Sequence, residues 1–175
     1  EVVDHGNRFQ IRHNGSDAMD FKISETLISK PTWENWKDLI PHMSGRPIGE
    51  ITVFQNHLVL CYRTLGLPKI WIMEFSTGKA HEIVFQEEDY AVDIKEGREW
   101  NTSQLRIIYS SLTTPATVFD YDMDTRKWEL RKKTEVIGQF SPEDYYALRI
   151  LAPTVDGVKV PISLLYAKGT PLDGT

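Results

Sequence analysis

Apolar and polar residues alternate along short segments of this chain, and the segments recur in a fixed order. A period of two is typical of β-strands with one buried face. Each unit has an apolar strand, a turn, a strand rich in aromatic residues, a tight turn and a strand that ends in charged residues. Phe9, Leu58 and Leu105 occupy matching positions in three such units, 49 and 47 residues apart. The pattern therefore predicts three copies of one antiparallel unit.

The predicted strands fall at similar places within each unit. They cover residues 8–14, 20–25 and 35–40 in the first unit, 57–63, 69–75 and 80–85 in the second, and 104–111, 116–122 and 127–133 in the third. A further strand precedes the second and third units, at 49–55 and 90–96. Four strands in every 40–50 residues, roughly, are the spacing of β-propeller blades. Residues 32–39, the best helix candidate, are interpreted as a turn that leads into a strand.

Two equivalent turns differ in their glycine content. Residues 76–79, Ser-Thr-Gly-Lys, supply a glycine where a tight hairpin needs a positive φ. The matching turn of the third unit, Asp124-Thr125-Arg126, has no glycine. A longer or bulged connection is therefore predicted there.

The repeat stops after residue 134. Residues 137–145 are rich in turn formers, and their Ser-Pro-Glu-Asp run predicts one helical turn. Two strands follow at 147–154 and 158–169, joined at Asp156-Gly157, which is a strong hairpin signal. The expected organisation is a set of propeller blades at 1–134, a linker at 135–146 and a hairpin at 147–175.

Composition and charge narrow the possible partners. The 175 residues are 41% hydrophobic and 26% charged, which is ordinary for a globular domain. A net charge of −5, with no basic run longer than residues 131–133, argues against a nucleic-acid partner. No apolar run is long enough to cross a membrane. The single cysteine, Cys61, cannot form an internal disulfide and is expected to be a buried, inert thiol.

Three long segments carry a family resemblance. They are HLVLCYRTLGLPKIWIMEFSTGKAHEIVF at 57–85, LRIIYSSLTTPATVFDYDMDTRKWELRKK at 105–133 and YYALRILAPTVDGVKVPISLLYAKG at 145–169. The first two resemble the last two propeller blades of the prolyl oligopeptidase family of serine peptidases, in its oligopeptidase B (protease II) branch. The third resembles the first hairpin of the family's α/β-hydrolase domain. The fold class implied is all-β: about three blades of a seven-bladed propeller, then a linker and that hairpin.

The resemblance also implies a function for the parent protein. It would be a cytoplasmic peptidase that cleaves short peptides after Arg or Lys, with a propeller gate that limits substrate size. The family's serine, aspartate and histidine lie beyond residue 175, so no catalytic, cofactor-binding or metal-binding residue is expected in this chain. Ser110 and Ser111 lack the glycines of a G-x-S-x-G turn. The chain should therefore be inactive alone, and its expected partners are the missing peptidase domain and short basic peptides.

Other polar and aromatic residues receive structural interpretations. Asp120, Asp122 and Asp124 alternate as in a calcium loop, but Thr125 and Arg131 occupy the required Gly and Glu positions, so a shared strand face at the propeller rim is expected. A weaker hypothesis lets these carboxylates attract a basic peptide. Zinc-type spacing is absent from the histidines, which are His5, His13, His42, His57 and His81. Filling of gaps between blades is expected of the tryptophans, which are Trp33, Trp36, Trp71, Trp100 and Trp128.

Some assignments stay open at this level. The Thr113-Thr114-Pro115 loop is expected to pack against the peptidase domain. An incomplete propeller exposes blade edges and an apolar face, so self-association is also expected. The alternatives are a free-standing propeller-type interaction module without peptidase activity and an independent β-sandwich domain, for which the long repeat is awkward.

Overall fold

The computed structural model describes residues 1–95, 97 and 99–174. Blade 1 contains β1 (Val2–His5), β2 (Arg8–His13), β3 (Lys22–Leu27) and β4 (Lys37–Ile40). Blade 2 contains β5 (Ile48–Val53), β6 (His57–Thr64), β7 (Leu67–Glu74) and β8 (Ala80–Glu82). Blade 3 contains β9 (Tyr90–Lys95), β10 (Gln104–Ser111), β11 (Thr117–Asp122) and β12 (Trp128–Lys133). A separate hairpin contains β13 (Tyr145–Pro153) and β14 (Lys159–Ala167).

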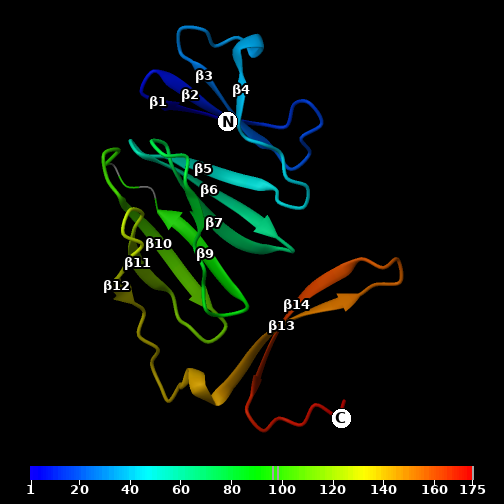
Figure 1. Cartoon of the computed structure of the whole chain (residues 1–175). Helices are drawn as coiled ribbons and strands as arrows, with labels where there is room; N and C mark the ends of the chain where they lie inside the picture. The colour runs from blue at the N-terminus through cyan, green and yellow to red at the C-terminus, as the bar shows by residue number, and fades with distance from the viewer. Residues whose placement is uncertain (96, 98, 175) are drawn as a thin grey trace.

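Each blade is a four-stranded antiparallel sheet in which every strand pairs with the next one along the chain. Figure 1 shows the three blades following one another as successive layers, with the hairpin below the lower ends of the blades. This arrangement confirms the predicted partial β-propeller. Two 3₁₀ turns complete the structure, at Trp33–Asn35 and Pro142–Asp144. Both confirm sequence predictions, the first as a turn into a strand and the second as one helical turn.

Several strand boundaries differ from the prediction by one to three residues, and one strand was not predicted. β1 was not predicted, because it is short and no turn signal precedes it. β5 ends at Val53 and not at residue 55. The strand predicted at 90–96 is β9, and its predicted last residue, Glu96, lies outside the described residues. β8 stops at Glu82 and not at residue 85. After Glu82, Ile83 is buried among residues of blades 2 and 3, and Phe85 stacks on Tyr109 of blade 3 with ring centroids 5.3 Å apart.

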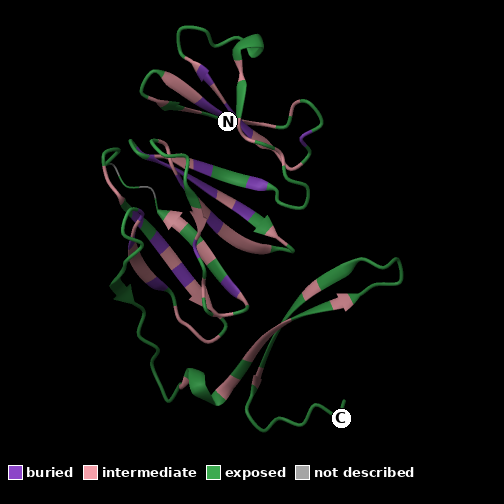
Figure 2. Cartoon of the chain, in the orientation of Figure 1, coloured by how far each residue is buried: buried purple, intermediate pink, exposed green. Residues whose placement is uncertain are grey.

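Two apolar seams hold the blades together, and buried residues concentrate there (Figure 2). The first seam, between blades 1 and 2, consists of Ile23, Ile48, Ile51, Leu58, Leu60 and Met73. The second seam, between blades 2 and 3, consists of Phe54, Val59, Ile70, Ile72, Ile83, Leu105, Ile107, Tyr121 and Met123. Burial of such side chains is worth about 1.5–3 kcal/mol each, so the seams dominate the stability of the fold.

The tryptophans do not fill the gaps between blades as a group, so that prediction is wrong for most of them. Trp71 packs against the first seam. Trp33, Trp100 and Trp128 are 53%, 46% and 41% exposed. Trp33 packs on Trp36 within blade 1, with ring centroids 4.6 Å apart. Trp128 borders the second seam, since its ring lies 4.9 Å from that of Tyr121.

The two blade-end turns have the same geometry, so the longer connection predicted at Asp124–Arg126 is wrong. In blade 2 the N–H of Gly78 donates to the Glu74 carbonyl at 2.9 Å, with φ of 67° at Gly78. In blade 3 the N–H of Arg126 donates to the Asp122 carbonyl at 2.7 Å, with φ of 61° at Arg126. The Asp122 carboxylate accepts the Thr125 N–H at 2.7 Å. This side-chain bond stabilises the turn without a glycine. A register shift does occur, but inside the sheet, between Val118 and Phe119.

The hairpin was predicted well. Gly157 adopts a φ of 82° in the turn between β13 and β14, as the Asp-Gly signal indicated. β13 begins at Tyr145, two residues before the predicted strand, directly after the 3₁₀ turn.

The matched turns make a paired prediction about stability. Gly78→Ala places a Cβ at a left-handed position and should lower the free energy of unfolding by roughly 1 kcal/mol. Arg126→Gly relieves the same strain and should raise it by roughly 0.5–1 kcal/mol, after the entropic cost of glycine. Urea unfolding of both variants measures the two changes. Effects of the same sign would contradict the equivalence of the turns.

Candidate functional site

The loop between β10 and β11 gathers hydroxyl side chains on the edge of the blades nearest the hairpin. Ser111 donates from its hydroxyl to Glu87 at 2.5 Å. The same oxygen accepts the N–H groups of Thr113 at 3.0 Å and Thr114 at 2.8 Å. These bonds make Ser111 a brace of its own loop. Among the described contacts of Ser111 there is no histidine, and Ser110 lies in the ladder opposite Ala91.

Glu87, in the connection between blades 2 and 3, holds this loop in place, and no local sequence pattern marks it. Its carboxylate accepts four hydroxyl hydrogen bonds, from Tyr109 at 2.5 Å, Ser111 at 2.5 Å, Thr113 at 2.9 Å and Thr114 at 3.0 Å. Burial opposes ionisation of Glu87, but the four donors outweigh it, so the pKa of Glu87 lies below its usual range. The Glu87 carboxylate thus fixes the loop to the connection between blades 2 and 3.

The Thr113-Thr114-Pro115 loop lies beside the linker. A shallow groove of about 200 Å³ separates the two segments and is lined by residues 111–115, Val136 and Phe140. The structure therefore brings this loop next to the chain that leads to the hairpin. Packing of the loop against a complete peptidase domain stays a prediction.

The hairpin reaches the propeller through Arg149 of β13. Its guanidinium forms an ion pair with Asp89, in the connection between blades 2 and 3, and donates to the carbonyl of Leu65 at 2.8 Å. The backbone N–H of Arg149 donates to the Glu88 carboxylate at 3.4 Å. Neither Arg149 nor Asp89 stands out in the sequence, because their positions are 60 residues apart. The acidic run at 87–89 was the only available hint.

The three alternating aspartates do not form one site. Asp120 and Asp122 share a face of β11, but Asp124 lies in the following turn because the strand ends at Asp122, so the predicted common face is wrong. Arg106 donates to both Asp120 oxygens, at 2.8 and 2.9 Å, and Arg131 lies 3.4 Å from Asp120. These guanidinium contacts hold the pKa of Asp120 below its usual range. Asp120 is thus already neutralised within blade 3, which weakens the idea that it attracts a basic peptide.

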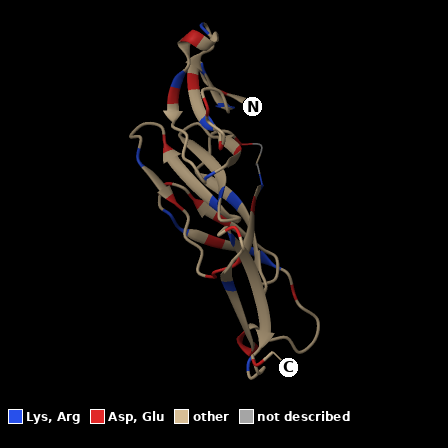
Figure 3. Ribbon diagram, turned by 90° about the vertical axis from the view of Figure 1, so that its right-hand side faces the viewer, with Lys and Arg blue, Asp and Glu red and all other residues tan. Residues whose placement is uncertain are grey.

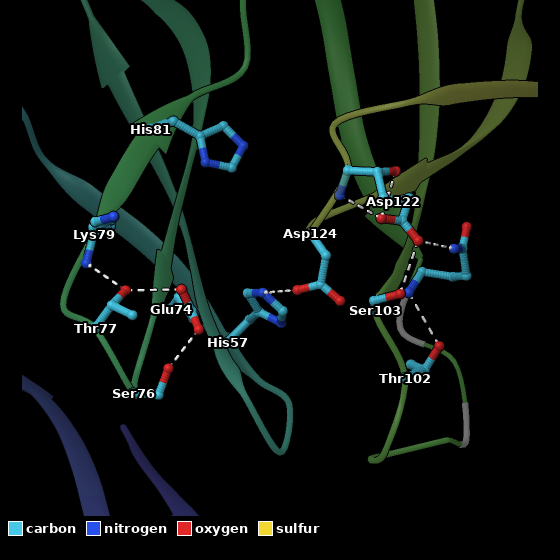
Figure 4. A network of polar contacts seen from close by, with 12 residues as sticks. His57, Glu74, Ser76, Thr77, Lys79, His81, Thr102, Ser103, Asp122 and Asp124 are labelled. Atoms are coloured by element: carbon cyan, nitrogen blue, oxygen red, sulfur yellow. Dashed lines mark hydrogen bonds and ion pairs between the residues drawn. The ribbon is translucent and has the colours of Figure 1, made fainter.

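The opposite edge of blades 2 and 3 carries a second polar network, drawn in Figure 4. His57, buried at the start of β6, points across to Asp124, with its Nε2 3.1 Å from the Asp124 carboxylate. Glu74 accepts hydrogen bonds from Ser76 and from Thr77, the latter at 2.8 Å. The network closes the second seam at this edge, where the apolar side chains end.

The remaining histidines have structural contacts. His5 stacks on Phe75, with ring centroids 4.0 Å apart, and so links blade 1 to blade 2. His81 lies 2.8 Å from the Tyr121 hydroxyl and links blade 2 to blade 3. His13 bonds to Ser24 inside blade 1, and His42 lies 3.8 Å from Asp20. In the described part of the chain, no three His, Cys, Asp or Glu side chains are grouped to hold a metal ion.

Three further observations concern the thiol, the surface charge and the helices. Burial, followed by the charges of Glu50 and Asp93, raises the pKa of Cys61 to about 12, so the thiol stays protonated at neutral pH. Acidic and basic residues are interspersed along the molecule (Figure 3). The helices of the described residues are all too short to span a bilayer.

Comparison with known proteins finds related sequences over nearly the whole chain. The sequence model described as "Prolyl oligopeptidase, N-terminal beta-propeller domain" matches residues 1–134. Dipeptidyl aminopeptidase BI of Pseudoxanthomonas mexicana is 29% identical over 98% of this chain. Protease 2 of Moraxella lacunata is 26% identical over 75% of it. The chain spans about a quarter of the length of these relatives, 24% of the first and 19% of the second.

Solved structures agree with the sequence relatives. Oligopeptidase B from Trypanosoma brucei with covalently bound antipain superimposes with a TM-score of 0.89 and 31% identity, over 98% of this chain and 25% of that one. Oligopeptidase B from Leishmania major gives a TM-score of 0.87 and 29% identity, over 99% of this chain and 25% of that one.

The blade 2–blade 3 contact at His81 predicts a pH dependence. Burial, then the charges of Arg126 and His57, lowers the pKa of His81. The unfolded chain therefore takes up this proton more readily than the folded one. Stability is fully present above the ordinary histidine pKa of about 6.5 and is lost as the pH falls through the lowered value.

His81→Asn removes this titration and keeps a polar side chain opposite Tyr121. Urea unfolding at pH 7.5 and pH 5.5 should show a smaller loss of stability in the variant than in the natural chain. The Asp and Glu groups with lowered pKa titrate below this window, and His13 titrates equally in both proteins. Equal losses in the two proteins would count against the assignment.

Proposed function

Because this chain belongs to the prolyl oligopeptidase family, whose N-terminal β-propeller it matches over residues 1–134, we propose that it is part of a gate that limits access to a peptidase active site. The parent protein is a serine-type peptidase that hydrolyses short peptides. Residues 1–134 supply the last blades of the propeller, residues 135–146 the linker, and residues 147–175 the first hairpin of the peptidase domain. The chemistry resides outside this segment.

The stacking of the blades carries this proposal. Three sheets packed face to face through apolar seams form a rigid wall, and such a wall excludes large substrates by shape alone. The hydroxyl cluster around Glu87 braces a loop, and the Asp122 carboxylate braces a turn. In this segment the serine that best resembles a nucleophile, Ser111, is occupied by Glu87 and two loop amides.

The proposed substrates are short peptides cleaved after Arg or Lys. Similarity to the two oligopeptidase B structures supports this specificity. The first strands of blades 1 and 2 add an observation, since each has one exposed acid, Asp4 and Glu50, whereas Asp93 in the first strand of blade 3 is paired with Lys95 at 3.9 Å. These strands are edge strands of their sheets, and we place them along the propeller channel. Carboxylates in that position attract cationic peptides. A cytoplasmic location is part of the proposal and agrees with the free thiol of Cys61.

The purified 175-residue chain tests the assignment of chemistry. It should not cleave a reporter peptide that contains a single Arg-X bond, even after long incubation. Cleavage that a serine-directed inhibitor abolishes would overturn the proposal. Light scattering on the same sample tests self-association through the exposed blade 3 face, where Leu130 is 58% exposed. Species larger than the 20.2 kDa monomer are expected, and a stable monomer would contradict this part.

The longer protein that carries this segment tests the gate. We expect hydrolysis of a short peptide with one Arg-X bond, and little hydrolysis of the same bond in an exposed loop of a folded protein. Leu105→Ala opens a cavity in the second seam and costs about 2–5 kcal/mol of stability, so it should loosen the wall and reduce this size selectivity. Equal cleavage of both substrates by the natural protein would contradict a gate.

A further inference from the structure

Arg149 occupies a built site on the propeller. Its side chain is 17% exposed and that of its partner Asp89 is 12% exposed, so the ion pair is largely shielded from solvent. The second arm of the guanidinium donates to the Leu65 carbonyl at 2.8 Å, in the turn between β6 and β7. One side chain thus joins the hairpin to two different connections of the propeller. The Arg149 socket is defined here as Leu65, Gly66, Glu88 and Asp89.

The backbone of the β6–β7 turn is shaped for this contact. Leu65 and Gly66 both have a positive φ, at 49° and 80°, as in the tight hairpin turns that favour glycine at the second position. A Cβ at Gly66 would lie 3.3 Å from an Arg149 terminal nitrogen and 3.7 Å from Pro161 of β14. Glycine therefore lets the hairpin approach closely while the Leu65 carbonyl faces the guanidinium.

The rest of the hairpin has little other support. None of the residues of β13 or β14 is buried: four of the nine residues of β13 and seven of the nine residues of β14 are exposed, and the hairpin in Figure 2 has green and pink segments but no purple ones. The hydrogen bonds described between its two strands and residues 1–134 all start from Arg149. An isolated two-stranded hairpin is marginal at best in water. The order of β13 and β14 thus depends on this attachment.

The neighbouring Glu87 binds blade 3, whereas Asp89 binds the hairpin. It lies two residues before Asp89, yet its four hydroxyl partners all belong to blade 3. The connection between blades 2 and 3 is therefore fixed to blade 3 by Glu87, whatever the hairpin does. Asp89 is then presented from a rigid support.

We propose that the Arg149 socket is a self-contained docking site that fixes the hairpin to the propeller and works independently of the Glu87 cluster. Loss of the guanidinium contact releases β13 and β14 as one unit, and the three blades keep their structure. Loss of Glu87 frees the Ser111–Pro115 loop and leaves the hairpin docked. A lysine at position 149 does not replace the arginine, because one ammonium group cannot reach both the carboxylate and the carbonyl with the geometry of a planar fork. This inference goes beyond the gate proposed above and needs no peptidase activity.

Hydrogen exchange read by mass spectrometry tests the proposal on the chain itself. Arg149→Ala and Asp89→Asn should each accelerate exchange of the amides of β13 and β14 at least tenfold, and leave residues 104–122 within twofold of the natural chain. Arg149→Lys should behave like the alanine variant. Glu87→Gln should show the reverse pattern, with faster exchange at 109–117 and an unchanged hairpin.

Arg106→Ala is the matched control, because it removes another arginine–aspartate pair, that of Arg106 with Asp120, which lies inside blade 3. It should leave the hairpin unchanged. Unchanged exchange of the hairpin in Arg149→Ala would overturn the proposal. So would faster exchange in blade 3 and the hairpin together in any Arg149 or Asp89 variant, because the two attachments would then not be independent.

Discussion

Both faces of blade 2 pack against a neighbouring blade, and the stability of the fold depends on this double burial. Along β6, Leu58 and Leu60 point into the first seam, while Val59 and Cys61 point toward the second. A strand buried on both faces reads as a continuous apolar run, and residues 58–62 are such a run. Neither seam exists without its neighbouring blade, so the three sheets are stable only together. β12, at the free end of the series, is exposed at every position.

Because apolar side chains fill the seams between the blades, the polar side-chain clusters lie at the edges of the blades. On the edge near the hairpin, Glu87 braces the blade 3 loop and Asp89 holds Arg149. On the opposite edge, His57 and Asp124 close the second seam. Each cluster ends a layer or attaches a neighbouring element, and none surrounds a cavity suited to catalysis. This division agrees with a propeller that supports a reaction carried out by another part of the protein.

Much of the fold was predictable because its signals are local. Alternation, the repeat and the Asp156-Gly157 turn each depend on residues close in sequence, and all were confirmed. β8 ends early because the residues after Glu82 gain more from the second seam than from pairing at a sheet edge. The turn at Arg126 was predicted wrongly because a side-chain bond from Asp122 replaces the expected glycine.

The Glu87 and Arg149 clusters could not be predicted, because their partners lie far apart in the sequence. Glu87 meets its partners across 22 to 27 residues, and Arg149 meets the propeller across 60 to 84. Nothing in the local sequence distinguishes Glu87 or Asp89 from a solvated acid. The fold of blade 3 brings Glu87 to its partners, and the position of the hairpin brings Arg149 to Asp89 and Leu65.

Native-state hydrogen exchange at increasing urea concentration is the decisive measurement. If the blades share their stability through the two seams, the slowest amides of β6 and β10 should exchange through a single opening, with one free energy and one urea dependence. If the amides of β10 exchanged through an opening of clearly lower free energy while those of β6 stayed protected, blade 3 would unfold separately from blade 2. That result would contradict the account.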